Sequence, residues 1–247
     1  MINVVANKRS SGYTTYTTIA GVGLAFRRGH QQLFSGSADK TVKAWDLQQM
    51  GYVDTMFGHT DAVSCVNALS RERSVSCGGR DRSIRVWKVA DESQLVFNVP
   101  NHCDSVDCLA MVNEDHFVSG SQDGSLCVWS TFKKRPVLVK RNAHDSTTGS
   151  APWITSMACR PYTDMVVTGA SDGLVRLWHV AKDYRMFDAV VKIPAPGFVN
   201  SLSISANGQL LVCALGREHR LGRWWKMDGA RDDVMVVPLR YDVDKCS

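Results

Sequence analysis

Short runs in which apolar and polar residues alternate recur from about residue 20 to residue 240. Alternation with a period of two is typical of half-buried β-strands. Dipeptides and tripeptides with good turn chemistry, such as Ala-Asp-Lys and Gln-Asp-Gly, separate the runs. No segment has the period of a long amphipathic helix. The pattern therefore predicts an all-β fold of short strands with turns at regular spacing.

Five of these runs end alike, in a tryptophan. The runs end at Trp45, Trp87, Trp129, Trp178 and Trp225, so the steps are 42, 42, 49 and 47 residues. Six residues before each of the first four tryptophans lies an aspartate: Asp39, Asp81, Asp123 and Asp172. A period of roughly 40–45 residues is typical of the WD repeat, which builds a four-stranded blade. The longest step contains the polar stretch 145–152, which has the composition of a loop.

The repeat predicts a buried hydrogen-bond network in each blade. Ten residues before the first four tryptophans lie Ser35, Cys77, Ser119 and Thr168. A histidine lies 28 residues before Trp87 (His59), 27 before Trp129 (His102) and 34 before Trp178 (His144). The aspartate can accept a bond from the histidine, the histidine can reach the hydroxyl, and the hydroxyl can reach the indole N–H. Such a network must be fully satisfied to help. We expect Cys77 to weaken the second network, and the fifth repeat to lack one, because residues 216–220 replace its aspartate turn.

The repeats predict five blades of a WD-repeat β-propeller. The predicted blades are 20–57, 58–97, 98–143, 144–193 and 194–240, preceded by a polar segment 1–19 and followed by a tail 241–247. Such propellers most often have seven blades, and a closed ring hides each blade's faces against its neighbours. We therefore expect this chain to be part of a seven-bladed ring, with one or two N-terminal blades lying outside it.

Composition excludes only a few kinds of ligand, metal site and cellular location. The formal charge is +5, from 29 basic and 24 acidic residues, which permits a nucleic-acid partner without requiring one. Eight cysteines include no C-x-x-C pair, so the usual zinc spacing is absent, and we predict buried thiols in a reducing compartment. No run reaches the roughly 18 apolar residues of a membrane span, and residues 1–16 lack the apolar core of a signal peptide. We predict an intracellular protein without a metal, a cofactor or a membrane.

Several longer motifs resemble one family. They are Gly23-Leu-Ala-Phe-Arg-Arg28, Phe57-Gly-His-Thr-Asp-Ala-Val63, Ala68-Leu-Ser-Arg-Glu72, Gly78-Gly-Arg-Asp81, Val86-Trp-Lys88, Glu92-Ser-Gln-Leu-Val-Phe97, Lys133-Lys-Arg-Pro136, Gly197-Phe-Val-Asn-Ser-Leu202, Glu218-His-Arg-Leu-Gly-Arg-Trp-Trp225 and Val237-Pro-Leu-Arg240. Together they resemble the WD-repeat protein of the U3 small nucleolar ribonucleoprotein (snoRNP), over about residues 21–240. The two motifs that contain Asp81 and Trp225 are the most specific.

The resemblance implies a function. Members of this family are nuclear and nucleolar, and they bind the box B/C region of U3 small nucleolar RNA beside a small kink-turn-binding protein. With the box C/D snoRNP proteins and the small-subunit processome they act in pre-rRNA processing and small ribosomal subunit biogenesis. They are not enzymes. The resemblance therefore implies a U3 RNA-binding component of this particle.

The expected RNA contacts are basic residues in the turns. Because the aspartates and histidines bond to each other, their turns and loops should share one face of the propeller. The candidates there are Lys40, Arg80, Arg82, Arg217, His219 and Arg220. Basic side chains can neutralise phosphates, and arginine can stack on or fork to splayed bases. A solvated turn charge is the competing interpretation of each residue. Arg80 stands out, because the other repeats carry Ala38, Gln122 and Ser171 at its position.

The sequence also bears on two other classes of function, an enzyme and a protein-only scaffold. An enzyme is disfavoured, because the chain has no Gly-rich phosphate loop, no G-x-S-x-G and no H-E-x-x-H, and we predict no catalytic residue. A protein-only scaffold, such as a ubiquitin-ligase substrate receptor, stays open. The Trp-Asp-x-Arg feature of such receptors is absent, since the matching positions read Trp45-Asp-Leu-Gln48 and Trp87-Lys-Val-Ala90. Crosslinking to RNA in cells would separate the two.

Overall fold

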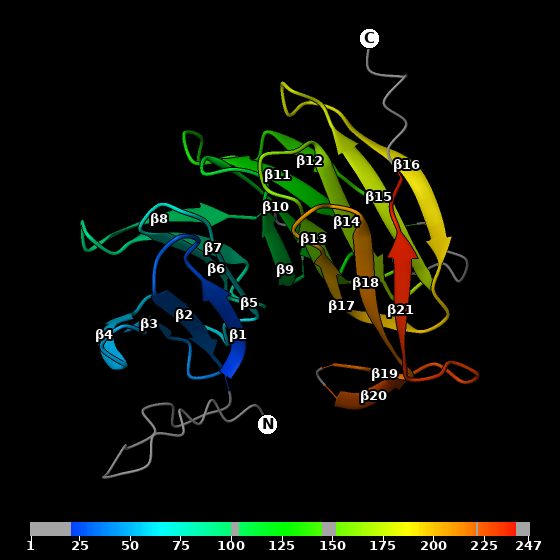
Figure 1. The fold of residues 1–247 in the computed structure, drawn as a ribbon, viewed down its shortest axis with the longest axis horizontal. Coiled ribbons are helices and arrows are strands. Elements are labelled where there is room, and N and C mark those ends of the chain that lie inside the picture. The colour runs from blue at the N-terminus through cyan, green and yellow to red at the C-terminus, as the bar shows by residue number, and fades with distance from the viewer. Residues whose placement is uncertain (1–20, 100–103, 145–151, 221, 241–247) are drawn as a thin grey trace. The chain divides into compact units, whose positions relative to one another are not determined.

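The fold is all-β, as the alternating pattern predicts. The structure is a computed structural model, and it describes residues 21–99, 104–144, 152–220 and 222–240. Every regular element in these ranges is a β-strand (Figure 1). The same ranges hold no helix long and apolar enough to span a membrane. The chain divides into two compact units, unit 1 (Met1–Val106) and unit 2 (Asp107–Ser247).

Unit 1 holds two four-stranded antiparallel sheets. The first sheet has the order β1-β2-β3-β4 and the second β5-β6-β7-β8, so each is a simple meander. The strands are β1 (Gly21–Phe26), β2 (Gln32–Ser37), β3 (Val42–Asp46), β4 (Gly51–Met56), β5 (Cys65–Ala68), β6 (Arg73–Cys77), β7 (Ser83–Lys88) and β8 (Ser93–Asn98).

The two sheets of unit 1 pack face to face. Strands β1 and β2 of the first blade lie against β5 of the second, and Phe34, Val42 and Val63 between them are fully buried. Gly36 makes the close approach possible, because a Cβ at this position would collide with the side chains of Val63 and Val66.

Unit 2 holds three further blades. Two are four-stranded meanders, β9 to β12 and β13 to β16, and the third is a three-stranded sheet of order β17-β18-β21. The strands are β9 (Val106–Met111), β10 (His116–Ser121), β11 (Leu126–Ser130), β12 (Leu138–Lys140), β13 (Ile154–Cys159), β14 (Met165–Ala170), β15 (Leu174–Val180), β16 (Phe187–Pro194), β17 (Phe198–Ile204), β18 (Leu210–Gly216), β19 (Glu218–His219), β20 (Gly222–Lys226) and β21 (Asp233–Pro238).

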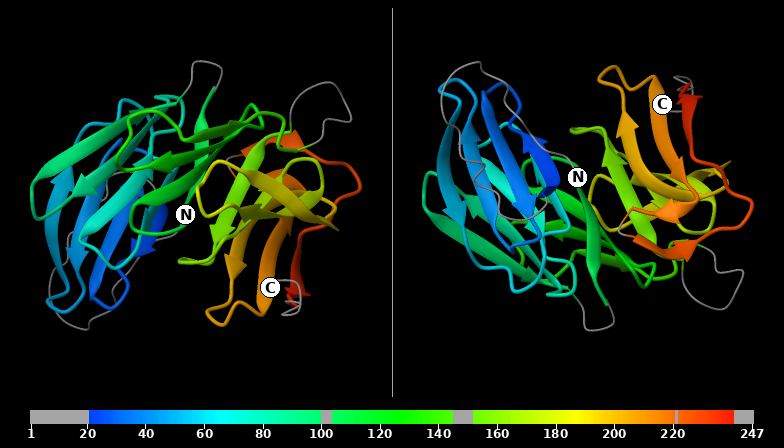
Figure 2. Two further views of the ribbon diagram at one scale, coloured as in Figure 1. Left: turned by 90° about the horizontal axis from the view of Figure 1, so that it is seen from above. Right: turned by 90° about the horizontal axis from the view of Figure 1, so that it is seen from below.

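Burial in unit 2 depends on where a strand lies in its blade. Strand β17 lies beside β13 and β14 (Figure 2), so the fourth blade is covered by its neighbours. Accordingly β14 is buried on both faces from Val166 to Ala170, and it does not show the predicted alternation. The outermost strand, β16, is mostly exposed between its buried Phe187 and its end. Neither strand alternates as predicted, because β14 is buried on both faces and most of β16 is exposed on both.

The fifth blade is not built as the tryptophan spacing predicts. The segment that ends in Trp225 corresponds in the repeat to the third strand of the other blades, but it is β20, which pairs with β19 in a separate hairpin. Strand β21 takes the third position beside β18, with Cys213 opposite Met235. The hairpin is thus an insertion between the second and third strands of this blade. Residues 217–220 lack the aspartate that fixes the turn in the other blades.

Some predictions fall outside the described residues. These are the polar segment 1–19, the tail 241–247, His102 of the third repeat and most of the insertion 145–152. Six cysteines are described, and these six are not in disulfides. Cys77, Cys108, Cys127 and Cys213 are buried, whereas Cys65 and Cys159 are partly exposed. Within the described ranges, no group of three or more His, Cys, Asp or Glu residues could hold a metal ion.

Candidate nucleic-acid interface

Four turns share one design, and we call them the Asp turns: residues 38–41, 80–83, 122–125 and 171–174. In each, the aspartate Oδ1 accepts a bond from the backbone N–H two residues later, at 2.8 to 3.0 Å. The residue between has a left-handed backbone, with φ of 72° at Lys40, 54° at Arg82, and 73° at both Gly124 and Gly173. This conformation favours glycine, so the turns of the first two blades place a cation where glycine fits best.

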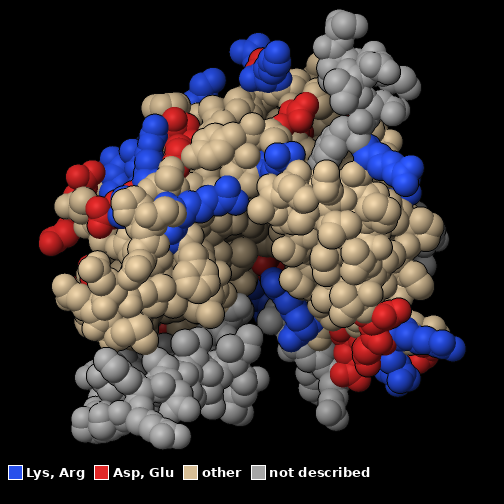
Figure 3. Space-filling model, viewed as in Figure 1, with Lys and Arg blue, Asp and Glu red and all other residues tan. Residues whose placement is uncertain are grey.

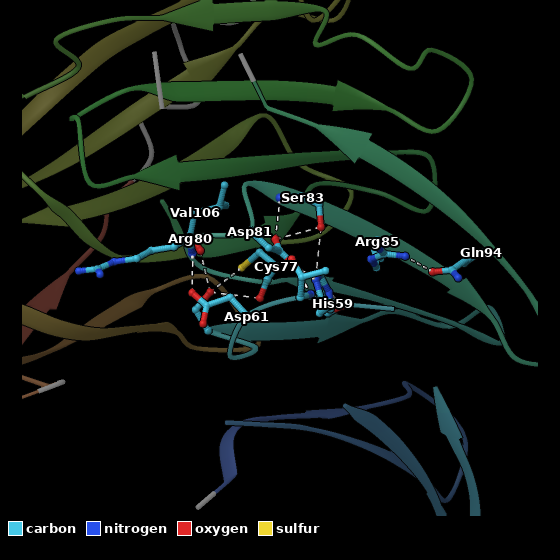
Figure 4. A network of polar contacts seen from close by, with 12 residues as sticks. His59, Asp61, Cys77, Arg80, Asp81, Ser83, Arg85, Gln94 and Val106 are labelled. Carbon is cyan, nitrogen blue, oxygen red and sulfur yellow. Dashed lines mark hydrogen bonds and ion pairs between the residues drawn. The ribbon is translucent and has the colours of Figure 1, made fainter. Parts of the chain in front are cut away.

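The network predicted for the second blade is complete. The Nδ1 atom of His59 lies 2.6 Å from Asp81 Oδ2 (Figure 4). Its Nε2 atom lies 2.8 Å from Ser76 Oγ. The indole of Trp87 donates to the same hydroxyl at 2.7 Å. Because an ionised carboxylate only accepts, His59 donates to Asp81 and accepts from Ser76. Burial would raise the pKa of Asp81, but the bonds from His59 and Ser83 outweigh it and lower the pKa.

Cys77 is not the network residue of this blade, so the prediction of a weakened network was wrong. The hydroxyl comes from Ser76, eleven residues before Trp87, because the turn is one residue longer than in the other blades. Gly78 and Gly79 accommodate the extra residue. A side chain on Gly78 would collide with Asp81 and His59, and Gly79 has a φ of 54°.

The fourth blade has the same network. His144 lies 2.8 Å from Asp172 and 2.9 Å from the Thr168 hydroxyl, which also accepts the indole N–H of Trp178 at 2.7 Å. The buried Arg176 adds a contact to Asp172 at 3.4 Å. In the first and third blades, Trp45 and Trp129 donate to the predicted serines, Ser35 and Ser119, at 2.8 and 2.9 Å.

The predicted contact residues of unit 1 all reach solvent. Lys40, Arg80 and Arg82 are exposed in the Asp turns of the first two blades. The backbone N–H of Arg80 donates to Asp61 Oδ2 at 3.2 Å, while its side chain extends away from the network (Figure 4). Structure therefore fixes the main chain of the turn and leaves the Arg80 guanidinium available to a ligand.

The predicted residues of unit 2 divide into two kinds. Arg217 is exposed, and its backbone N–H donates to Asp232 Oδ1 at 2.8 Å. The guanidinium of Arg220 reaches inward and donates to the Asp107 carbonyl at 2.7 Å. Arg220 is also anchored through its N–H, which donates to Asn200 Oδ1 at 3.0 Å. Of the two arginines, Arg217 therefore has the freer side chain.

His219 is not a surface contact in this arrangement, contrary to the prediction. It is 3% exposed and stacks on Trp153 at 3.9 Å between ring centroids, with Phe198 edge-on at 5.8 Å. Burial and the nearby charge of Arg220 lower the pKa of His219 to about 4, so the ring is neutral at pH 7. The basic character that the sequence assigns to residues 217–220 therefore belongs to the two arginines.

An anchor that the sequence did not reveal holds this segment. Trp153 donates its indole N–H to the buried Asp107 carboxylate at 2.6 Å and stacks on His219. Asp107, Trp153 and His219 come from the third, fourth and fifth blades. Neither Asp107 nor Trp153 belongs to the repeat pattern. Because that pattern is the only sequence signal for structural residues in this chain, the sequence could not identify them. Three blades of unit 2 are thus joined where the basic residues emerge.

A polar cleft of about 410 Å³ lies beside the anchored segment. Its lining residues are Asn200, Leu215, Gly216, Arg217, Glu218, Lys226 and Asp232. Basic and acidic side chains gather together near the β19–β20 hairpin and the start of β21 (Figure 3). The cleft therefore offers hydrogen-bond donors and acceptors rather than positive charge alone. The convergence of all six predicted residues on one rim stays a prediction, because they are divided between the two units.

Comparison with known proteins agrees with this geometry. The family model "WD domain, G-beta repeat" matches residues 13–46, 51–88, 93–130 and 140–179. The chain belongs to the WD-repeat family. A solved structure of U3-55K is 47% identical, with a TM-score of 0.84, and the match covers 89% of this chain and 68% of that one. The resemblance to the U3 snoRNP WD-repeat proteins and the propeller fold are thereby confirmed.

Two curated relatives carry informative names. U3 small nucleolar RNA-interacting protein 2 of Homo sapiens is 48% identical over 60% of this chain and 32% of its own length. Ribosomal RNA-processing protein 9 of Saccharomyces cerevisiae is 26% identical over 85% of this chain and 48% of its own length. The chain spans about half the length, or less, of the curated relatives it matches.

Proposed function

We propose that this chain is a non-enzymatic component of the U3 snoRNP that binds U3 small nucleolar RNA. In this role it acts in pre-rRNA processing and small ribosomal subunit biogenesis, in the nucleolus. The names of its relatives, an RNA-interacting protein and a ribosomal RNA-processing protein, support the proposal. The expected partners are the box C/D snoRNP proteins, including the kink-turn-binding protein, and the small-subunit processome.

One observation supports the RNA contact most strongly: Arg80 and Arg82 flank Asp81 in a turn whose main chain is held by hydrogen bonds. Asp81 is held by His59 and Ser83, and the main chain of Arg80 by Asp61. Two exposed guanidinium groups thus stand on a rigid base, which reduces the conformational entropy lost when a ligand binds. Guanidinium groups fork to phosphates and stack on splayed bases, as recognition of single-stranded RNA loops requires.

In unit 2 the same role falls to Arg217, with Arg220 as a positioning residue. Arg220 holds the segment against Asp107 and Asn200, so the exposed side chain of Arg217 projects from an anchored loop. The adjacent cleft contains both carboxylates and cations. Carboxylates weaken binding to phosphates, so their presence favours contact with base edges at this point over contact with the backbone alone.

The decisive test removes Arg80 and measures binding of a U3 RNA fragment that contains the box B/C region. We expect Arg80→Ala to weaken binding roughly tenfold, the loss of one good arginine contact, with the unfolding free energy unchanged to within about 0.5 kcal/mol. Arg28→Ala is the matched control, since Arg28 is an exposed arginine in the β1–β2 connection, at the end of the first blade opposite its Asp turn.

If Arg80→Ala and Arg28→Ala bind the RNA fragment with equal affinity, Arg80 does not contact the RNA. Crosslinking in cells tests the wider proposal, because recovery of U3 RNA supports it. Recovery of protein partners without RNA would favour the protein-only scaffold instead.

A further inference from the structure

Four loops at the other end of the unit 2 blades form one continuous surface. We call it the loop face: residues 112–115, 131–137, 160–164 and 181–186. These connections join first to second and third to fourth strands, so they lie opposite the Asp turns. Tyr162 bonds through its N–H to the Val112 carbonyl at 2.7 Å and through its hydroxyl to Glu114 at 3.0 Å. Asn113 donates to the Tyr184 hydroxyl at 2.6 Å.

The loops 112–115 and 131–137 of the third blade are also joined by a hydrogen bond. The backbone N–H of Thr131 donates to the Asp115 carbonyl at 2.8 Å. Beneath the surface, His116 stacks flat on Tyr184 at 3.8 Å between ring centroids. The loop face is therefore a preorganised surface that spans the third and fourth blades rather than a set of separate loops.

Cations on the loop face are free, whereas the acids are engaged. The exposed side chains of five basic residues make no hydrogen bond or ion pair with any described residue: Lys133, Lys134, Arg135, Lys182 and Arg185. Each acid on the same loops accepts a bond. Glu114 accepts from Tyr162, and Asp115 from Thr131. Asp164 lies 3.0 Å from His179, and Asp183 accepts the N–H of Arg185. A carboxylate that accepts a bond from a neutral donor keeps its charge, but the five cations outnumber the four acids, so the loop face has a net positive charge.

Two aromatic rings stand out among these cations. Phe132, which directly precedes the basic triplet, is 77% exposed, and Tyr162 is 61% exposed. The backbone of Tyr162 is left-handed, with a φ of 63°, and Tyr184 has a φ of 59°. Bulky residues adopt this conformation only when their surroundings impose it, and such strain clusters at functional sites. Exposed rings beside free cations are what single-stranded nucleic acid binds, through base stacking and phosphate neutralisation.

We propose that the loop face of unit 2 binds single-stranded RNA, with bases stacked on Phe132 and Tyr162 and phosphates at the five cations. This contact is distinct from the U3 RNA contact at the Asp turns and does not depend on it. More than half of each ring is exposed to solvent, which suits a strand of stacking bases. An acidic protein segment would need a pocket for its apolar side chains.

The test measures binding of a fluorescein-labelled 12-nucleotide oligouridine to the full chain by anisotropy at several salt concentrations. Phe132→Ala should weaken binding roughly tenfold without changing the salt dependence, because it removes one stacked base. Replacing Lys133, Lys134 and Arg135 together by alanine should weaken binding and lower the slope of log affinity against log salt by about two. Phe132→Tyr keeps a stacking ring and should restore wild-type affinity.

Matched controls locate the effect. Phe57→Ala removes another ring that is 71% exposed, and Arg231→Ala removes an exposed cation of unit 2 that lies outside the loop face. Both should leave oligouridine binding unchanged, and ultraviolet crosslinks should map to residues 131–136. The proposal is wrong if Phe132→Ala binds like the wild type, or if the crosslinks map elsewhere. It is equally wrong if a polyglutamate peptide, but not oligouridine, depends on the basic triplet.

Discussion

The second blade and the fifth blade hold their arginines by opposite means. In the second, a polar network of Asp81, His59 and Ser76 holds the turn, and Arg80 and Arg82 are exposed. In the fifth, no such network exists among the described residues. There the ring of His219 is clamped between aromatic side chains, and Arg220 itself becomes an anchor.

This difference shows that a basic turn can be fixed either by a repeat motif or by contacts between blades. The motif is local, because all its members lie within one sheet and the loop before it. The clamp joins Asp107, Trp153 and His219 from three blades of unit 2. A substitution in the motif should therefore affect one blade, whereas a substitution in the clamp should loosen several.

The largest effect is expected at Trp153. Trp153→Ala removes a buried ring and the indole donor to Asp107, and it should lower the unfolding free energy by about 4 kcal/mol. Trp153→Phe keeps a ring for His219 and should lose less than half as much. Chemical denaturation of both variants measures the difference. A loss below about 1 kcal/mol for Trp153→Ala would mean that the clamp does not hold the fifth blade.

A smaller effect is expected at Ser76. Its hydroxyl serves both His59 and Trp87, so Ser76→Ala leaves two buried groups without their partner and should cost about 3 kcal/mol. Cys77→Ala is the control, with an expected loss of about 1 kcal/mol for one buried sulfur. Melting curves of the two variants compare them. Equal losses would show that the register of this network is misassigned.

The smallest effect depends on pH and comes from His219. Its folded pKa of about 4 lies below the ordinary value of 6.5, so protons bind the unfolded state first as the pH falls. Stability attributable to this residue is unchanged above about pH 6.5 and decreases between 6.5 and 4, by about 2 kcal/mol at pH 5. His219→Gln removes the titration. The wild type should therefore lose about 2 kcal/mol more than the variant between pH 7 and pH 5, and parallel profiles would contradict the buried, neutral ring.

Sequence spacing predicted the parts of the fold that repeat. The Asp–Trp interval placed Asp39, Asp123 and Asp172 in turns of one design, and the hydroxyls of Ser35, Ser119 and Thr168 accept the indole N–H as expected. These predictions succeed because short-range turn chemistry determines both the interval and the contact. They fail where the interval changes. In the second blade, counting ten residues back from Trp87 gives Cys77, because the turn contains one extra residue beside Gly78, and the hydroxyl comes from Ser76 instead.

Long-range packing could not be predicted in the same way. Trp225 ends a segment with the right composition, yet it belongs to an inserted hairpin, because no Asp turn precedes it to fix the register. His219 belongs to a basic run in the sequence but packs inside, since Trp153, more than sixty residues earlier, supplies its stacking partner. Of the candidate site, the exposed cations of the Asp turns were identified, whereas the clamp that positions Arg217 was not.

The left-handed backbone at Lys40 and Arg82 has a consequence for protein engineering. Glycine at these positions would relieve the turn, with a net gain in stability below about 1 kcal/mol once its greater freedom in the unfolded chain is counted. Screening a library for heat resistance would thus enrich glycine at both positions. Selected variants would tolerate higher temperatures while losing two of the cations expected to grip RNA, so stability and affinity should be selected together at these turns.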